Sequence, residues 1–163
     1  MKNLRVVYMG TPDFAVPCLE RLVSEGYQIA AVVTQPDRPK GRGRKLTPSP
    51  VKETALKHNL PVWQPEKVKT PEFVAQLEAL NPDVIIVVAF GQLLSPQILV
   101  IPEYGCINVH ASLLPKYRGA APIHWAVING ETETGVATMY MDAGLDTGDV
   151  ILERTVSIDP EET

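Results

Sequence analysis

The sequence has few of the residues that build metal, disulfide and redox sites. Its 163 residues include only two cysteines, Cys18 and Cys106, which lie far apart in apolar segments. Neither belongs to a Cys-x-x-Cys pair, and the three histidines do not have a metal-binding spacing. We therefore expect no metal site and no dithiol chemistry, with both cysteines buried and reduced.

Long apolar runs and cofactor motifs are missing as well. No apolar stretch approaches the ~20 residues of a membrane-spanning helix, and the first residues lack the apolar core of a signal peptide. One glycine, Gly10, stands where a dinucleotide-binding enzyme has Gly-x-Gly-x-x-Gly, and there is no Walker or Gly-x-Ser-x-Gly motif. These absences predict a cytoplasmic protein with no membrane partner and no nicotinamide or flavin cofactor.

The composition is ordinary for a soluble protein, but charge is distributed unevenly along the chain. The net charge is −4, and 45% of the residues are hydrophobic. Residues 37–52 alone carry +5, which leaves −9 for the rest of the chain. A solvated linker is the commoner explanation of such a segment. The contrast also favours an exposed loop that contacts a polyanion.

Apolar runs and helical patterns alternate along the chain. Runs rich in Val and Ile are typical of strands buried on both faces of a parallel sheet, and they occupy residues 4–9, 29–34, 84–89 and 106–110. Helices are predicted at 13–26, 49–58, 70–80 and 122–129, and antiparallel strands at 134–141 and 150–158. The pattern predicts an α/β protein with an open, mainly parallel sheet and helices on both faces.

Asn108 and His110 end the last of these apolar runs and are the strongest candidates for chemistry. Alternate residues of a strand project to the same face, so both side chains can enter one pocket. A lone histidine is more often structural, but the amide beside it and the long loop that follows favour an active site at the end of the strand. Asp142, Asp146 or Asp149 could orient the imidazole, and spacing alone does not choose among them.

The motifs together resemble those of the folate-dependent formyltransferase family. Asn108-Val109-His110 is followed by Ser112-Leu113-Leu114-Pro115 and then by Leu145-Asp146-Thr147-Gly148. The segments 9–14, 34–52 and 89–92 are similar to the branch of the family that acts on transfer RNA. The resemblance covers essentially the whole chain and implies a Rossmann-like sheet of the formyltransferase type.

The resemblance implies transfer of a formyl group from 10-formyltetrahydrofolate to the amino group of methionine on initiator tRNA. The family roles fall on Asn108, His110 and Asp146. Asn108 and a protonated His110 stabilise the oxyanion of the tetrahedral intermediate, where each donor is typically worth ~3–4 kcal/mol. Asp146 keeps His110 protonated and helps to relay the proton of the amine.

Binding residues are implied in the same way. The folate-binding residues implied are Ser112, Leu113, Leu114, Pro115, Phe90, Gln92, Leu94 and Asp142. The tRNA-binding residues implied are Arg42 in first place and, in support, Arg38, Lys40, Arg44 and Lys45. No obligate protein partner is implied. Because the family carries a further β-rich tRNA-binding domain, we expect residues 1–163 to be a shortened catalytic domain without it.

Two other interpretations stay open. The first is another 10-formyltetrahydrofolate-dependent enzyme that acts on a sugar amine, a glycinamide nucleotide or water. The cationic segment argues against it, because a small substrate needs no polycationic arm. The second is a non-catalytic RNA-binding domain that keeps only the fold.

Overall fold

The computed structural model describes residues 3–110, 133–142 and 150–157 and divides into two compact units. The first unit is Met1–Cys106 and the second is Ile107–Thr163. Within the described residues, no helix is long and apolar enough to cross a membrane.

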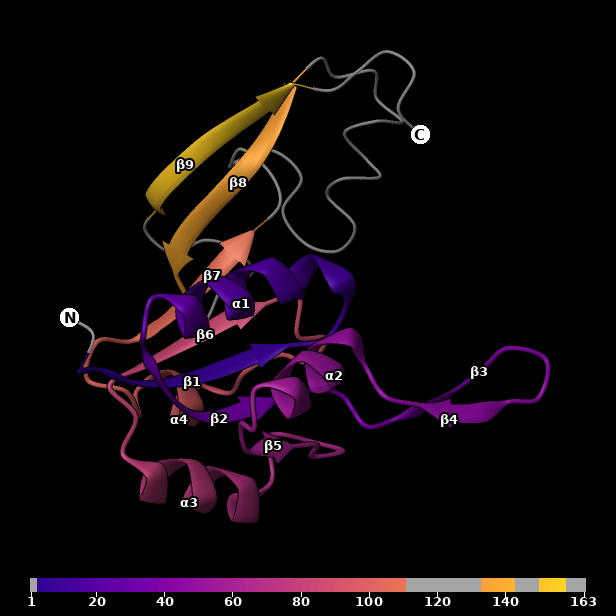
Figure 1. The fold of residues 1–163 in the computed structure, drawn as a ribbon. Coiled ribbons are helices and arrows are strands. Elements are labelled where there is room, and N and C mark those ends of the chain that lie inside the picture. The colour runs from indigo at the N-terminus through magenta and orange to yellow at the C-terminus, as the bar shows by residue number, and fades with distance from the viewer. Residues whose placement is uncertain (1–2, 111–132, 143–149, 158–163) are drawn as a thin grey trace. The chain divides into compact units, whose positions relative to one another are not determined.

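A parallel sheet forms the centre of the first unit (Figure 1). Its strands, in spatial order, are β5 (Val62–Trp63), β2 (Gln28–Val33), β1 (Arg5–Gly10) and β6 (Val84–Val88). The side chains of β1 from Val6 to Met9 are almost completely buried, as expected for a strand covered on both faces. The runs predicted for β1, β2 and β6 are therefore confirmed to within one residue at each end.

The second and third helices of this unit begin where the sequence predicts, whereas the first begins at Val16 and not near Asp13. α1 (Val16–Ser24) follows a short 3-10 turn and carries its proline in the first turn, where the missing N–H costs nothing. Ser49 and Thr70 cap α2 (Pro50–Lys57) and α3 (Pro71–Leu80), accepting hydrogen bonds from Lys52 N and Phe73 N at 3.0 and 3.2 Å. A four-residue helix, α4 (Pro96–Leu99), was not predicted.

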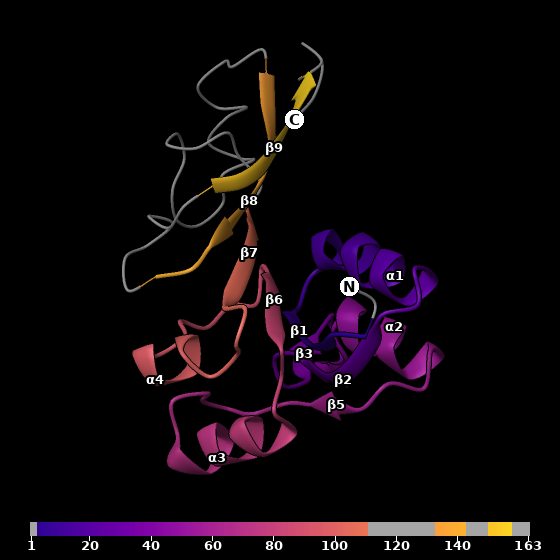
Figure 2. The same cartoon turned by 90° about the vertical axis from the view of Figure 1, so that its left-hand side faces the viewer.

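The strand order explains where the helices lie. The chain moves outward from β1 through β2 to β5 and then returns to β6 on the other side of β1. Right-handed crossovers therefore place α1 and α2 on one face of the sheet and α3 on the other, as Figures 1 and 2 show. A hydrogen bond between Glu20 Oε2 and His58 Nε2, 2.8 Å long, also joins α1 to the end of α2. The predicted sheet with helices on both faces is confirmed.

Part of the cationic segment 37–52 forms two short strands, where its composition predicts an exposed loop. β3 (Arg38–Lys40) and β4 (Lys45–Thr47) pair as an antiparallel hairpin, separate from the central sheet. We call residues 38–47 the basic hairpin. The prediction of exposure is confirmed, because every residue from Arg38 to Leu46 is exposed.

The second unit is antiparallel where it is described. β7 (Cys106–His110) begins at the unit boundary and pairs with β8 (Glu133–Tyr140), which pairs in turn with β9 (Val150–Ser157). The two strands predicted near the C-terminus are confirmed to within one residue. The helix predicted at 122–129 lies outside the described residues.

Gly10 allows a close backbone approach at the end of β1, and its replacement tests the packing there. A Cβ added at Gly10 would lie 2.9 Å from both Ala15 Cβ and Val88 O. We expect Gly10→Ala to lower the free energy of unfolding by about 1–3 kcal/mol, measured in urea. Gly43→Ala is the matched control, because nothing lies within 4 Å of its Cβ. Equal stability of the two variants would contradict this packing.

Candidate functional site

Asn108 and His110 occupy one face of β7, as the alternation of a strand predicts. In the ladder with β8 they lie opposite Met139 and Ala137, which are almost completely buried. His110 is itself only 7% exposed, and Asn108 is half-buried. An amide and an imidazole therefore share a strand face with apolar neighbours, and in such surroundings hydrogen bonds to a developing charge are stronger than in water.

The other residues predicted around this pair are mostly outside the described residues. These are Asp146 and the segment 112–115. Asp142, which follows β8, is described and is exposed. Of the three residues with predicted catalytic roles, the structure therefore brings together Asn108 and His110.

The loop after β6 holds the remaining predicted folate-binding residues. Phe90 is 2% exposed, and its carbonyl oxygen accepts a hydrogen bond from Thr11 Oγ1 at 2.7 Å. Leu94 is half-buried. Ala89 and Gly91 both have positive φ, 49° and 98°, so the chain turns sharply around Phe90. At this turn the Phe90 side chain is buried in the protein.

The side-chain amide of Gln92 is used within the protein. Its Nε2 donates to Gln35 Oε1 at 3.0 Å and to Pro65 O at 3.3 Å, and its Oε1 accepts from Val68 N at 3.0 Å. Gln92 thereby fixes the loop after β6 to the segment after β5. A shallow pocket of about 460 Å³ lies next to this loop, lined by Glu66, Lys67, Lys69, Gln92 and Leu93.

The register of the basic hairpin gives it one cationic face and one apolar face. Lys40 lies opposite Lys45, and Arg38 lies opposite Thr47, so these cations share one face. Pro39 and Leu46 form the other face, and Leu46 is 63% exposed. Like charges directly opposite one another destabilise a strand pair, so an anion bound at this face would relieve repulsion. The other predicted tRNA-binding residues, Arg42 and Arg44, are exposed in the turn.

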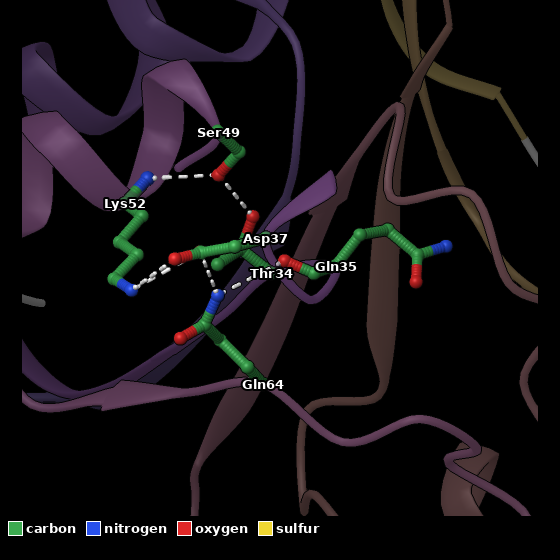
Figure 3. A network of polar contacts seen from close by, with 6 residues as sticks. All are labelled: Thr34, Gln35, Asp37, Ser49, Lys52 and Gln64. Atoms are coloured by element: carbon green, nitrogen blue, oxygen red, sulfur yellow. Dashed lines mark hydrogen bonds and ion pairs between the residues drawn. The ribbon is translucent and has the colours of Figure 1, made fainter. Parts of the chain in front are cut away.

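Two side-chain links close the base of the hairpin (Figure 3). The hydroxyl oxygens of Thr34 and Ser49 lie 2.6 Å apart, and Lys52 Nζ lies 3.1 Å from each carboxylate oxygen of Asp37. Gln64 Nε2 also donates to Asp37 Oδ1 at 2.7 Å. The hydrogen bonds from Gln64 and Lys52 lower the pKa of Asp37, so its carboxylate is ionised at neutral pH.

Sequence reasoning missed this network. Gln35 and Asp37 belong to the segment 34–52 that carries the resemblance, but the sequence assigned no role to them or to Gln64. The one available signal was an acid placed directly before a run of cations. The partners come from three separate segments, and no local spacing predicts that they meet.

The two thiols offer no nucleophile at neutral pH. Both Cys18 and Cys106 are free. Burial raises the pKa of Cys106 to about 12 and also raises that of Cys18. Within the parts of the chain that the structure describes, no three His, Cys, Asp or Glu side chains gather as metal ligands would.

Comparison with known proteins connects these features to one family. The family model described as formyl transferase matches residues 2–163. Over 162 residues the chain is 64% identical to the methionyl-tRNA formyltransferase of Geobacter metallireducens. This alignment covers 99% of this chain and 52% of that protein. The chain is 66% identical over 160 residues to the protein of the same name from Pelotomaculum thermopropionicum, covering 98% and 51%. The chain thus spans about half the length of the curated relatives it matches.

Solved structures with the same fold are more distant in sequence. The phosphoribosylglycinamide formyltransferase of Bacillus halodurans superimposes with a TM-score of 0.79 at 26% identity, covering 98% of this chain and 82% of that one. Glycinamide ribonucleotide transformylase 1 from Geobacillus kaustophilus also gives 0.79, at 28% identity, with 99% and 86% covered.

Proposed function

The chain belongs to the formyl transferase family, and on that premise we propose that it transfers a formyl group from 10-formyltetrahydrofolate to the amino group of methionine on initiator tRNA. The basic hairpin is the observation that carries the choice of acceptor. Three of its exposed cations, Arg38, Lys40 and Lys45, share one face, which suits an RNA backbone better than a small amine. The names of the relatives that are more than 60% identical support the same acceptor. Initiation of protein synthesis would place the reaction in the cytoplasm.

The pair on β7 has the chemistry that formyl transfer needs. The donor supplies a formyl carbonyl whose oxygen gains negative charge when an amine attacks. The Asn108 amide would donate a hydrogen bond to that oxygen, and a protonated His110 would donate a second, each worth ~3–4 kcal/mol in the transition state. Asp146 would hold His110 in its protonated form and help to take the proton that the amine loses. The bond between the formyl carbon and N10 of the folate would then break, and N10 would take up a proton, so that tetrahydrofolate leaves and the formyl group stays on the amine.

The donor would be held by the residues that the family resemblance implies. We assign its site to Ser112–Pro115, to Phe90, Gln92 and Leu94 in the loop after β6, and to Asp142. The structure of that loop fits a ligand bound through backbone groups, because Phe90 is buried and the Gln92 amide is occupied. On this basis Gln92 would shape the folate site by holding the loop in place.

The basic hairpin would bind the acceptor end of the tRNA. Arg38, Lys40 and Lys45 would contact phosphates from one face, and Arg42 and Arg44 would extend from the turn. An acceptor end presents a single-stranded terminus next to a phosphate-lined helix, so it offers both charge and accessible bases. The exposed apolar face formed by Pro39 and Leu46 suits contact with an unstacked base.

Acceptor preference tests the proposal. With 10-formyltetrahydrofolate as donor, we expect the full-length gene product to formylate initiator methionyl-tRNA with a kcat/KM at least about 10³-fold above that for a sugar amine or a glycinamide nucleotide. Such a ratio is the size that an extended polyanion site provides. Product formation is followed by acid-gel separation of formylated tRNA and by folate absorbance. Preference for a small amine, or release of formate alone, would assign the chain to another reaction of the family.

A further inference from the structure

The base of the basic hairpin is an anchored structure, and Asp37 is at its centre. Asp37 is 30% exposed at its side chain and Lys52 is 20% exposed, so their ion pair is partly shielded from water. It joins the chain that enters the hairpin to the first turn of α2, which follows it. The Thr34–Ser49 contact adds a second link between the same two segments.

Further amides fix this base to the sheet. Gln64 Nε2 lies between Asp37 Oδ1, at 2.7 Å, and Gln35 O, at 3.3 Å. The Gln35 side chain in turn accepts from Gln92, and Gly91 leaves the space that Gln35 occupies, since a Cβ there would lie 2.7 Å from Gln35 Nε2. The direction in which the hairpin leaves the domain is therefore set by side chains from the segments after β2, β5 and β6.

The charge of Asp37 is unfavourable for RNA binding if only its sign is considered. It is the one acid among residues 37–52, and its removal would raise the charge of that segment from +5 to +6. A carboxylate in this position repels phosphate and so lowers the affinity of the segment for RNA. Its presence here therefore indicates a structural role that offsets this repulsion. Its three hydrogen bonds, two from Lys52 and one from Gln64, indicate that this role is to hold the base of the hairpin.

We propose that Asp37 is a positioning residue for the acceptor RNA: by joining Lys52 and Gln64 it holds the cationic face of the basic hairpin in the direction that RNA binding requires. This inference rests on the proposed function, because it concerns the same acceptor. In this role Asp37 does not bind the RNA itself. It repels the phosphates and acts only by orienting the hairpin.

The substitution Asp37→Asn tests the proposal by the sign of its effect. A positioning role predicts a rise of about 5–10-fold in KM for initiator methionyl-tRNA, because a charge-assisted link is lost. Kcat at saturating tRNA and KM for 10-formyltetrahydrofolate should stay the same. Charge alone predicts the reverse, a lower KM. The measurement is steady-state formylation by the full-length gene product, with Kd for the tRNA from filter binding.

Two further variants complete the test. Glu53→Gln removes the same charge from an exposed position in the first turn of α2, and we expect KM for tRNA to fall slightly or stay constant. Gln64→Met breaks one link to Asp37 without a charge change, and we expect KM to rise by about 2–5-fold. It also replaces Asp37→Asn as the deciding variant if that protein does not fold.

The outcomes separate this inference from the proposed function. If wild-type protein formylates the tRNA and both Asp37→Asn and Gln64→Met bind it as well as wild type or better, the positioning role is wrong. If the wild type does not use tRNA as an acceptor, the proposed function itself is wrong.

Discussion

Replacing His110 by alanine is expected to lower kcat for formylation of initiator methionyl-tRNA by about 10²–10⁴-fold, the contribution of a positioned proton donor or acceptor. The physical reason is that His110 would serve both as a hydrogen-bond donor to the formyl oxygen and as a carrier of positive charge. Neither role is needed to hold the RNA. Kd for tRNA should therefore stay within about twofold, and single-turnover formylation with excess enzyme measures the chemical step directly.

Controls at the same strand face separate chemistry from folding. His110 is 7% exposed, so alanine leaves a cavity and Tm must be compared with that of wild type. His110→Gln keeps an N–H donor without a positive charge, and we expect a rate between those of alanine and wild type. Asn108→Ala removes one donor and should cost about 10²–10³-fold. Retention of most of kcat by His110→Ala, with normal tRNA binding, would contradict the role assigned to His110. A wild-type protein that binds the tRNA without formylating it would favour the non-catalytic RNA-binding domain.

The elements that the sequence predicted well are those with local causes. Ser49-Pro50 and Thr70-Pro71 each combine a side chain that accepts from the backbone with a proline that needs no donor. Both helices begin there in the structure. Asn108 and His110 share a face because strand geometry alternates with a period of two, independent of everything else in the fold.

The elements that were missed depend on distant partners. β5 has only two residues, Val62 and Trp63, and exists because the edge of β2 offers them hydrogen bonds, such as Thr34 N to Trp63 O at 3.0 Å. The basic hairpin was predicted as an exposed loop because the segment contains prolines, glycines and many cations. Pro39 is tolerated because a two-stranded ladder leaves each strand with a free edge that needs no N–H donor. The links at its base join residues from separate segments, and no local pattern predicts them.

Removing the charge of the basic hairpin is the second large effect that we expect. Alanine at Arg38, Lys40, Arg42, Arg44 and Lys45 together should weaken binding of initiator tRNA by about 10²-fold or more near 0.1 M salt. All five side chains are exposed, and Lys40 and Lys45 lie opposite each other, so their loss relieves repulsion and should not lower Tm. Arg42→Ala alone should weaken binding by a smaller factor and lower the salt slope by about one unit.

The salt dependence of binding decides what these cations do. If each contacts a phosphate, the slope of log K against log salt should fall by about 0.7–0.9 for each cation removed. If the cations only attract RNA from a distance, their removal should lower the association rate constant and leave the dissociation rate constant unchanged. KM for 10-formyltetrahydrofolate should not change in either case, because the hairpin forms a sheet of its own. An unchanged affinity together with an unchanged slope would mean that the segment is a solvated linker, and the acceptor would then have to be reassigned.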